Sequence, residues 1–237
     1  MKNIIYAYNR TSDAGPDTSS FSVFMKGCNL RCPYCMNSKL IEGKHKVDAH
    51  IMKNLKKDVD HYKPEMIFIS GGEPTGNSLI LYNASSIFKS WGCKVGMSTN
   101  GTNPETLKKF IYGYKKIDYV AMDLKGNVDI YKDLGDSEYF MRVMASWVIL
   151  REEKRVRPEF EYEIRTTLYP PFITIEVLVD MAKLFHNDEK WVLQQFRQTP
   201  NMLDKNAKKV KPYSEKEMRD MCEVIKKIVP KTTVRYV

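Results

Sequence analysis

The chain has 237 residues and a formal net charge of +9, and its hydrophobic fraction of 43% and charged fraction of 28% are typical of a soluble globular protein. This length suffices for one domain with a single large core, and a second compact domain is possible but not required. The longest apolar stretches, Met66–Ile69 and Val143–Leu150, are much shorter than the roughly 20 residues that cross a bilayer, which excludes a membrane-spanning helix. Residues Met1–Arg10 lack the apolar core of a secretory signal, so we expect a cytoplasmic protein.

The positive charge comes from lysines scattered over the predicted helices, with a mild concentration in Lys205–Lys211. Such a pattern indicates either a solvated basic surface or a surface for an acidic partner or substrate, including a nucleotide. No nucleic-acid-binding motif accompanies the charge, so we expect no specific nucleic-acid partner. Charge alone does not choose between the first two interpretations.

Short apolar segments alternate with amphipathic segments from residue 20 onward. The predicted strands are Ser20–Lys26, Glu65–Ser70, Lys94–Ser98, Ile117–Leu124, Glu159–Thr167, Lys190–Phe196 and Thr232–Val237. The predicted helices are Asp48–Tyr62, Ser78–Trp91, Pro104–Tyr112, Tyr139–Arg151, Ile173–His186 and Ser214–Val229. A proline in the first turn of the third helix and a serine that caps the last one support these two helix starts.

The alternation of strands and helices predicts parallel βαβ units, arranged as an open doubly wound sheet or as a partial barrel. Polar side chains of chemical interest follow the ends of successive strands, and these ends form the reactive face of both architectures. The polar segments Asn9–Ser20 and Gln198–Pro212 are predicted to be loops, and neither resembles a domain linker. We therefore expect one domain over residues 1–237, with its core over about 20–197 and a C-terminal helix and strand over 213–237.

Three of the five cysteines, Cys28, Cys32 and Cys35, lie within eight residues in the pattern C-x3-C-x2-C. In a cytosolic protein such a group indicates metal binding rather than a disulfide. Three thiolates from one tight loop can hold three corners of a four-iron cluster. No fourth ligand follows nearby, so one iron would stay open for another ligand.

The alternative interpretation of this loop is a structural zinc site that takes a fourth ligand from His45, His50 or Cys93. Zinc sites of this kind usually combine paired ligand units, and the sequence offers no second pair. Cys93 and Cys222 each stand alone, and we expect both to be small buried apolar side chains.

The cysteine loop resembles the C-x3-C-Φ-C signature of the radical S-adenosylmethionine (SAM) superfamily, in which Φ is aromatic and is Tyr34 here. The resemblance implies a partial (βα)6 barrel, a 4Fe–4S cluster and SAM as cofactors. In that superfamily the open iron binds the amino and carboxylate groups of SAM. One electron from the cluster cleaves SAM to methionine and a 5′-deoxyadenosyl radical, which abstracts a hydrogen from the substrate.

The turn Gly71–Pro74 (GGEP) follows a predicted buried strand. Taken alone, it is an ordinary turn rich in glycine and proline. Two glycines also allow the backbone to approach a ligand closely, and the Glu73 carboxylate can pair with an ammonium group. At this position the turn resembles the GGE motif of the superfamily, which contacts the SAM amino group.

Three later strand ends carry further polar groups. From their residues alone, Ser98–Gly101 is a strand-to-helix turn, and Asp123 with Lys125 is an exposed ion pair of little energetic weight. Together with the RTT segment that begins at Arg165, they resemble the TNG, DLK and RTT-like segments of glycyl radical activating enzymes. Pyruvate formate-lyase activators have an acidic residue where this chain has Ser98. The segment Trp191–Arg197, which is also consistent with an ordinary buried strand, resembles one that borders the adenine.

The resemblance implies two sets of site residues. The metal ligands are Cys28, Cys32 and Cys35. The residues expected to contact SAM are Tyr34, Gly71, Gly72, Glu73, Ser98, Asn100, Asp123, Lys125, Arg165, Thr167 and Gln195.

From about residue 20 to its end the chain resembles the activating proteins of anaerobic ribonucleoside-triphosphate reductases, although these often have histidine where this chain has Met36. The resemblance implies a glycyl radical enzyme as partner and a flavodoxin- or ferredoxin-type electron donor. One rival is a radical SAM enzyme for a small molecule, such as a 7-carboxy-7-deazaguanine synthase. Another is a non-catalytic zinc- or cluster-binding module, which bound SAM would exclude.

Overall fold

An eight-stranded sheet organises the protein, whose computed structural model describes residues 7–11, 19–42 and 50–236. Neighbouring strands in the sheet follow the chain order from β1 to β8. The first pair is antiparallel, and every later pair is parallel. The strands are β1 (Ala7–Thr11), β2 (Ser20–Met25), β3 (Met66–Gly71), β4 (Lys94–Thr99), β5 (Tyr119–Asp123), β6 (Glu161–Leu168), β7 (Trp191–Gln195) and β8 (Thr232–Arg235).

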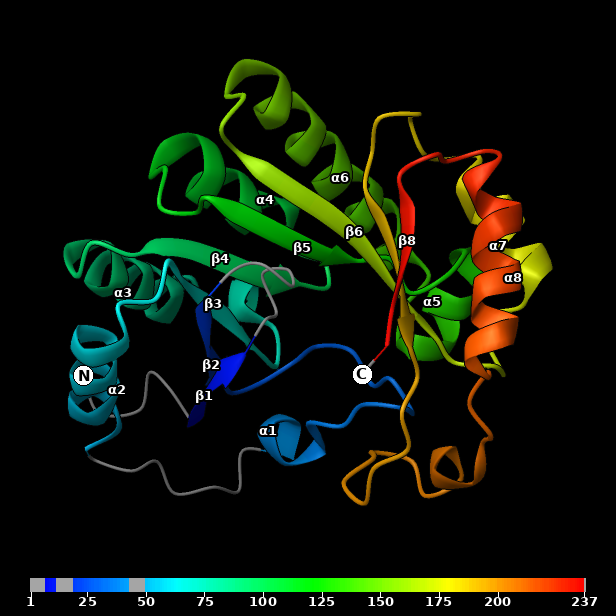
Figure 1. The fold of residues 1–237 in the computed structure, drawn as a ribbon, viewed down its shortest axis with the longest axis horizontal. Coiled ribbons are helices and arrows are strands. Elements are labelled where there is room, and N and C mark those ends of the chain that lie inside the picture. Colours follow the sequence, from blue (N-terminus) through cyan, green and yellow to red (C-terminus); the bar gives the residue numbers. More distant parts are fainter. Residues whose placement is uncertain (1–6, 12–18, 43–49, 237) are drawn as a thin grey trace.

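Helices connect the parallel strands, and most of them lie along the outer side of the curved sheet (Figure 1). They are α1 (Ser38–Glu42), α2 (Ile51–Tyr62), α3 (Ser78–Ser90), α4 (Pro104–Lys108), α5 (Val128–Leu134), α6 (Glu138–Val156), α7 (Ile175–Ala182) and α8 (Glu215–Lys226). Short turns of other helix types are η1 (Pro74–Gly76), η2 (Lys109–Gly113) and η3 (Ala207–Lys209). Within the described ranges, none of these helices has both the length and the apolar character to cross a bilayer.

The architecture confirms the expected partial α/β barrel. The sheet of described strands ends at β1 on one edge and β8 on the other and does not close. One strand was not predicted: residues Ala7–Thr11, part of which was expected to be a polar loop, pair with β2 in antiparallel register. The short helices α1 and α5 were also missed, and the predicted start of a helix at Asp48 lies outside the described residues.

The two faces of the sheet differ in a way that follows the two-residue period of a strand. On β3, Ile67 and Ile69 belong to the large core between sheet and helices. Phe68 lies between them in the sequence and belongs to a separate small cluster on the other face, with Met66, Tyr119 and Ala121. The centres of the Phe68 and Tyr119 rings are 6.1 Å apart. The inner face of the curved sheet is therefore only partly filled by apolar side chains.

A buried carboxylate ties the amino-terminal ends of β6 and β7 to α6. Glu189 is 4% exposed and accepts hydrogen bonds from Trp147 Nε1 (2.6 Å), Tyr162 OH (2.7 Å) and the His186 N–H (2.7 Å). Arg151 adds a bidentate pair through Nε (2.9 Å) and Nη2 (2.7 Å). No sequence motif indicated this cluster, because its members come from three segments far apart in the chain.

Candidate active site

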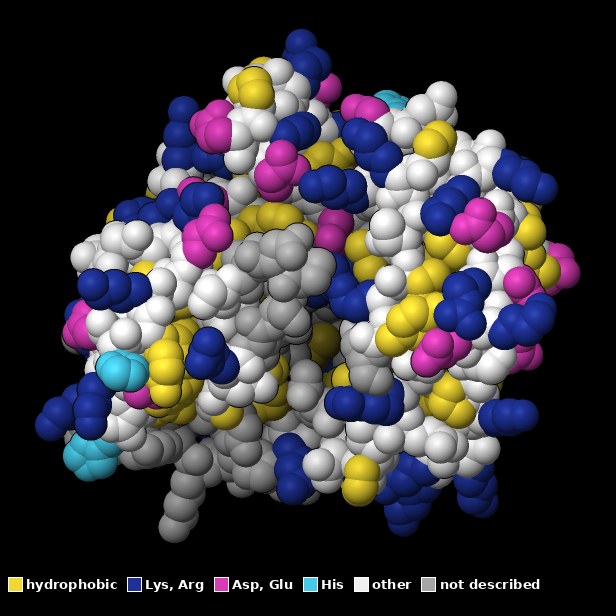
Figure 2. Space-filling view, viewed as in Figure 1, with side chains coloured by type: hydrophobic (Ala, Val, Ile, Leu, Met, Phe, Trp, Pro, Cys, Tyr) yellow, Lys and Arg dark blue, Asp and Glu magenta, His cyan; other side chains and the backbone are white. Residues whose placement is uncertain are grey.

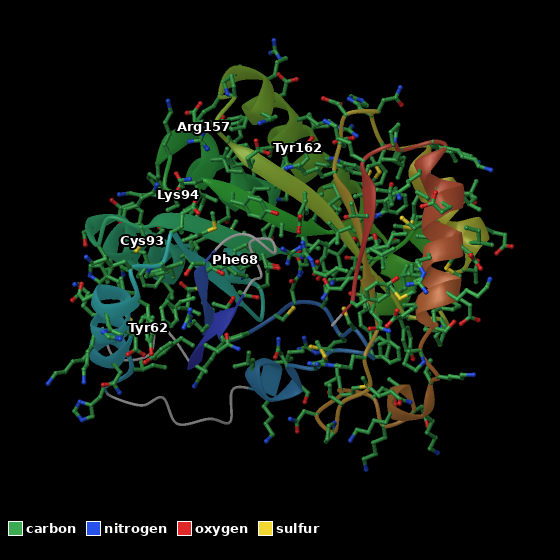
Figure 3. All side chains as sticks on the ribbon, in the orientation of Figure 1. Tyr62, Phe68, Cys93, Lys94, Arg157 and Tyr162 are labelled. Carbon is green, nitrogen blue, oxygen red and sulfur yellow. The ribbon has the colours of Figure 1, made fainter. Side chains whose placement is uncertain are left out.

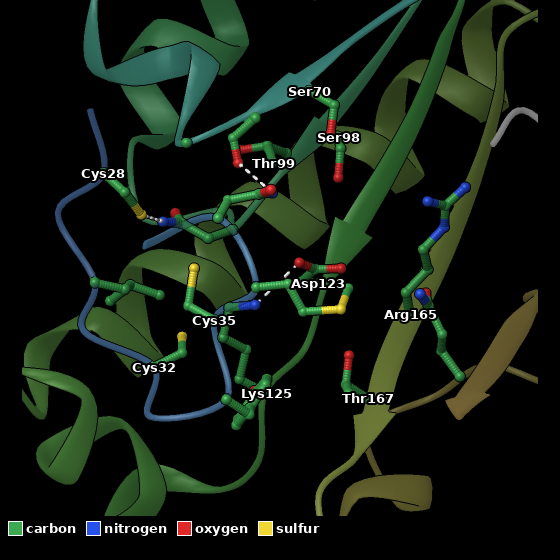
Figure 4. A pocket seen from close by; sticks show the side chains of 18 of the residues that line it. Cys28, Cys32, Cys35, Ser70, Ser98, Thr99, Asp123, Lys125, Arg165 and Thr167 are labelled. Carbon is green, nitrogen blue, oxygen red and sulfur yellow. Dashed lines mark hydrogen bonds and ion pairs between the residues drawn. The ribbon is translucent and has the colours of Figure 1, made fainter. Parts of the chain in front are cut away.

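A pocket of about 410 Å³ lies at the carboxyl ends of the parallel strands. Its size is within the usual range for small-molecule sites. Of the residues expected to contact a cluster or SAM, the pocket is lined by Cys28, Cys32, Tyr34, Cys35, Gly71, Gly72, Ser98, Asn100, Asp123, Lys125, Arg165, Thr167 and Gln195. Figure 4 shows the three cysteines on one side, with Arg165 and Thr167 across the pocket and Asp123 between them. The structure thus brings together residues spread over most of the chain.

The cysteine loop is fastened to the rest of the protein on several sides. The Arg31 N–H donates to Leu134 O at the end of α5 (3.2 Å), and the Gly27 N–H donates to Leu40 O in α1 (3.1 Å). The loop that follows β7 donates to it through the N–H groups of Leu203 and Asp204, at 3.1 Å and 3.0 Å. These bonds to the backbone fix the loop without using the three thiols.

The three thiols are the only cysteines of the described chain that lie near the pocket. Cys93 is buried beside Lys94 at the amino-terminal end of β4 (Figure 3), whereas the pocket lies at the carboxyl end of that strand. Cys222 is buried on α8, as expected for a small apolar side chain, and its Sγ lies 3.8 Å from Thr232 O. Cys93 is thus no fourth ligand, and His45 lies outside the described residues.

The arrangement of the thiols is informative about the metal they fit. Within the ranges 7–11, 19–42 and 50–236, no three His, Cys, Asp or Glu side chains are placed so that they could hold a single metal ion. A four-iron cluster needs a different arrangement, with one thiolate at each of three irons. Burial raises the pKa of all three thiols, so cluster binding must release their protons.

The two glycines of the GGEP turn are required by a close approach of two backbones. A Cβ on Gly72 would lie 1.8 Å from Gly27 O, at the start of the cysteine loop. Gly71 has φ +109°, and a Cβ there would lie 2.5 Å from Met25 N. The N–H groups of Gly72 and Glu73 donate to Met25 O (2.9 Å) and Gly27 O (2.7 Å). The turn therefore positions the cysteine loop, in addition to lining the pocket.

Glu73 is the one residue predicted to contact SAM that does not line the pocket, and its contact with SAM stays a prediction. Its side chain is 3% exposed, and both carboxylate oxygens are occupied. Oε1 accepts from Thr75 N (3.0 Å), Thr75 Oγ1 (2.6 Å) and Thr99 Oγ1 (2.7 Å), and Oε2 accepts from Asn100 N (2.6 Å). Burial raises the pKa of this carboxyl, against the effect of these donors. In this structure Glu73 joins the end of β3 to the end of β4.

Lys125 and Asp123 place a half-buried ion pair at the centre of the pocket. Lys125 Nζ lies 3.0 Å from Asp123 Oδ2, and 12% of the Lys125 side chain is exposed (Figure 4). Burial acts to lower the pKa of Lys125, but the Asp123 carboxylate and the Cys32 sulfur raise it well above its ordinary value. The lysine is therefore cationic and beside the cysteines, where it can pair with a ligand carboxylate.

The alternation of side chains along β6 explains which of its residues reach the pocket. Thr166 points to the opposite side and donates to Leu124 O (2.8 Å), whereas Arg165 and Thr167 line the pocket. Arg165 is 6% exposed, its Nε lies 2.5 Å from Glu163 Oε1, and its guanidinium lies 5.5 Å from the centre of the Phe68 ring. The ion pair holds a positive charge on the side of the pocket opposite the cysteines.

Several pocket residues were not among the individual residues predicted to contact SAM. They include Asn9 on β1, Asn37 and Ile41 after the cysteine loop, Ser70 on β3, and Gln194 and Arg197 in the segment predicted to border the adenine. Ser70 directly precedes the predicted Gly71, and Gln194 directly precedes the predicted Gln195. Both could have been found because ligands bind at the carboxyl ends of parallel strands. Asn9 could not be found in this way, because the strand that carries it was not recognised.

A partial α/β barrel with three thiols at the carboxyl ends of its strands is the architecture of an enzyme built around a metal cluster. The family model of the Radical SAM superfamily matches residues 22–156. The chain belongs to this superfamily. Its cofactors are accordingly a 4Fe–4S cluster and SAM, and the convergent thiols, the two glycines and the half-buried lysine of the pocket fit them.

Two relatives by sequence and one solved structure are informative. The chain is 31% identical to "Putative glycyl-radical enzyme activating enzyme" of Methanocaldococcus jannaschii, over 94% of this chain and 91% of that protein. It is 27% identical to 7-carboxy-7-deazaguanine synthase of Aquifex aeolicus, over 69% of this chain and 84% of that protein. SuiB of Streptococcus suis bound to SAM matches with a TM-score of 0.62 and 14% identity, which shows a shared fold. The match covers 89% of this chain but only 48% of SuiB.

We predict that Lys125→Met weakens SAM binding by about tenfold or more. A hydrogen bond to a charged group is worth about 1.5–3 kcal/mol, and the variant would lose its cationic partner for the SAM carboxylate. Calorimetric titration of cluster-loaded protein under nitrogen measures the affinity. The matched control is Lys89→Met, which breaks a pair with Asp118 (2.5 Å) away from the pocket. Equal affinities for SAM in both variants would contradict this role of Lys125.

Proposed function

We propose that this protein is an activating enzyme that removes a hydrogen atom from a backbone glycine of a glycyl radical enzyme, and that the partner is an anaerobic ribonucleoside-triphosphate reductase. The observation that carries the proposal is the similarity, over nearly the whole chain, to a protein named as a glycyl-radical enzyme activating enzyme. The DLK and RTT segments, which resemble those of reductase activators, support the choice of partner. Lys125 of the first segment and Arg165 of the second line the same pocket.

The proposal assigns distinct roles to the residues of the pocket. Cys28, Cys32 and Cys35 would hold the cluster, and Lys125 would orient the carboxylate of SAM. Reduced cluster and SAM together supply a radical strong enough to abstract hydrogen from carbon. The protein contributes orientation and exclusion of water, so no catalytic base is needed. Arg165, held by Glu163, would contact the ribose or carboxylate on the far side.

Two features support a protein as the substrate. The described sheet stays open between β1 and β8, so it does not enclose a small molecule as a closed barrel would. Lysine and arginine side chains are spread over the visible surface, interspersed with acidic ones (Figure 2). The net charge of +9 would favour encounter with an acidic partner. A flavodoxin- or ferredoxin-type protein would supply the electron.

The second candidate is a radical SAM enzyme for a purine-like small molecule. It is favoured by the similarity to 7-carboxy-7-deazaguanine synthase over 69% of this chain. The buried Arg165 would suit the carboxylate of an acidic substrate equally well. The two candidates differ in the source of the abstracted hydrogen.

The source of the hydrogen can be followed with deuterium. A candidate reductase is produced in cells that are supplied with deuterated glycine. The purified reductase is then mixed with cluster-loaded protein, SAM and a chemical reductant. We expect deuterium to appear in 5′-deoxyadenosine only when the labelled reductase is present. Deuterium-free 5′-deoxyadenosine, together with turnover of a purine-like acid, would instead support the second candidate.

A further inference from the structure

The side chain of Asn100 reaches the cysteine loop. Its Nδ2 lies 3.8 Å from Cys28 Sγ and 3.0 Å from Asn29 Oδ1. An amide nitrogen carries two hydrogens, so it can donate to both atoms at once. Asn100 is 5% exposed, and water is therefore a poor competitor for these bonds. The expectation from sequence was a contact with SAM, whereas the structure adds one with a cysteine ligand.

The orientation of this amide is fixed by its oxygen. Asn100 Oδ1 accepts from Thr102 N (3.0 Å) and Thr102 Oγ1 (2.7 Å). The flipped amide would place its oxygen against Asn29 Oδ1 and the Cys28 sulfur, and its nitrogen against the Thr102 N–H. Asn29 in turn donates from Nδ2 to Thr102 Oγ1 (2.8 Å). These bonds close a ring of three side chains in which only one orientation pairs every donor with an acceptor.

The backbone of Asn100 is held as firmly as its side chain. Its N–H donates to Glu73 Oε2 (2.6 Å), and the same carboxylate accepts from Thr99 Oγ1 (2.7 Å). The buried Glu73, which faces away from the pocket, thus sets the position from which Asn100 extends. A chain of hydrogen bonds therefore runs from the GGEP turn through Asn100 to a thiol of the cysteine loop.

We infer that Asn100 is a positioning residue for the cluster and raises its reduction potential through the hydrogen bond to Cys28 Sγ. Reduction adds negative charge to a cluster and its thiolates, so a donor to sulfur stabilises the reduced state more than the oxidised one. Hydrogen bonds to sulfur are one of the means by which proteins set such potentials. The inference depends on the cluster and on its ligand Cys28, and does not depend on which substrate the enzyme uses.

The inference is tested with Asn100→Leu and Asn100→Asp in cluster-loaded protein. Leucine removes the donor at similar volume, and aspartate keeps an oxygen for Thr102 but places a negative charge beside the sulfur. We expect both variants to have more negative midpoint potentials. For Asn100→Leu we expect a shift of about tenfold in the reduction equilibrium, which is about 59 mV for a one-electron couple. Redox titration followed by electron paramagnetic resonance measures the midpoint.

The control is Asn103→Ala. Asn103 belongs to the same turn region and donates to Thr75 Oγ1 (3.0 Å), but it does not line the pocket. The midpoint potential of the cluster in Asn103→Ala should equal that of the wild type. A cluster-loaded Asn100 variant with the wild-type potential would overturn the inference.

Should the Asn100 variants fail to bind a cluster, the wild-type protein itself provides the decision. Protein labelled only in the asparagine amide nitrogens is reduced without SAM, and pulsed electron paramagnetic resonance is used to detect coupling to the label. Coupling that is retained in Asn103→Ala and in Asn37→Ala, which removes the labelled amide of another pocket residue, supports the hydrogen bond to Cys28. Absence of any coupling in the wild type would show that no asparagine amide contacts the cluster and would overturn the inference.

Discussion

Replacing Cys32 by alanine is expected to remove the iron from anaerobically reconstituted protein, from about four irons per chain to nearly none. Cys32 is the middle cysteine of the loop and is 8% exposed at the edge of the pocket. The backbone bonds that hold the loop leave little freedom to recruit a distant ligand. Iron and sulfide analysis, together with the visible absorbance, measures the loss.

Cys93→Ala is the matched control for this experiment. Cys93 is as buried as Cys32, at 7% exposed, but lies at the other end of β4 from the pocket. The control should bind as much iron as the wild type. Full cluster content in Cys32→Ala, or loss of the cluster in Cys93→Ala, would contradict the proposed ligand set.

Replacing Glu189 by alanine is expected to lower the free energy of unfolding by about 3–5 kcal/mol. The change leaves Arg151 without its partner and removes the acceptor of Trp147 and Tyr162 at a buried position. Equilibrium unfolding in urea measures the loss, with an unchanged slope showing that the folded state is otherwise intact.

The control for Glu189 is Glu161→Ala. Glu161 also pairs with basic side chains, Lys154 at 2.7 Å and Lys190 at 3.5 Å, but 44% of its side chain is exposed. Exposed pairs are worth about 0–1 kcal/mol, so this variant should remain near wild-type stability. Similar losses in the two variants would show that burial of the Glu189 cluster is not what stabilises the protein.

The Glu189 contribution should also depend on pH. Burial acts to raise the pKa of this carboxyl, but the hydrogen bonds from Arg151, His186 and Tyr162 lower it below the ordinary value. A folded-state pKa below that of the unfolded chain stabilises the protein above the unfolded pKa. The contribution is lost as the pH falls through the folded pKa. Wild type and Glu189→Ala should therefore converge in stability under acid conditions.

The sequence predicted the parallel strands because their apolar runs and turn residues are local signals. The strand β1 was missed because its residues, such as Asn9 and Arg10, are polar, and its strand character depends on pairing with β2. The helix α5 was missed for another reason. It is short, although Asn127, whose Oδ1 accepts from Ile130 N (3.2 Å), is a cap that could have indicated it.

Residues of the pocket were predictable where a short motif marks the end of a strand, as with Lys125 or Thr167. What the motifs could not provide is the direction of each side chain. The motif predicts a contact between Glu73 and SAM, but it gives no sign of the three residues whose side chains or backbone donate to this carboxylate, which are Thr75, Thr99 and Asn100. The contacts from Thr99 and Asn100 join segments more than 20 residues apart and leave no mark in the local sequence, whereas Thr75 is a near neighbour of Glu73 in the chain.

The most direct test of the central claim is the electron paramagnetic resonance spectrum of the partner enzyme. Cluster-loaded protein, SAM, a reductant and an anaerobic ribonucleoside-triphosphate reductase encoded in the same organism are incubated together under nitrogen. The account predicts a doublet glycyl radical signal that requires SAM and is absent with Cys32→Ala. No glycyl signal on this reductase or on any other glycyl radical enzyme of the organism, while SAM is cleaved with a small purine-like substrate, would contradict it.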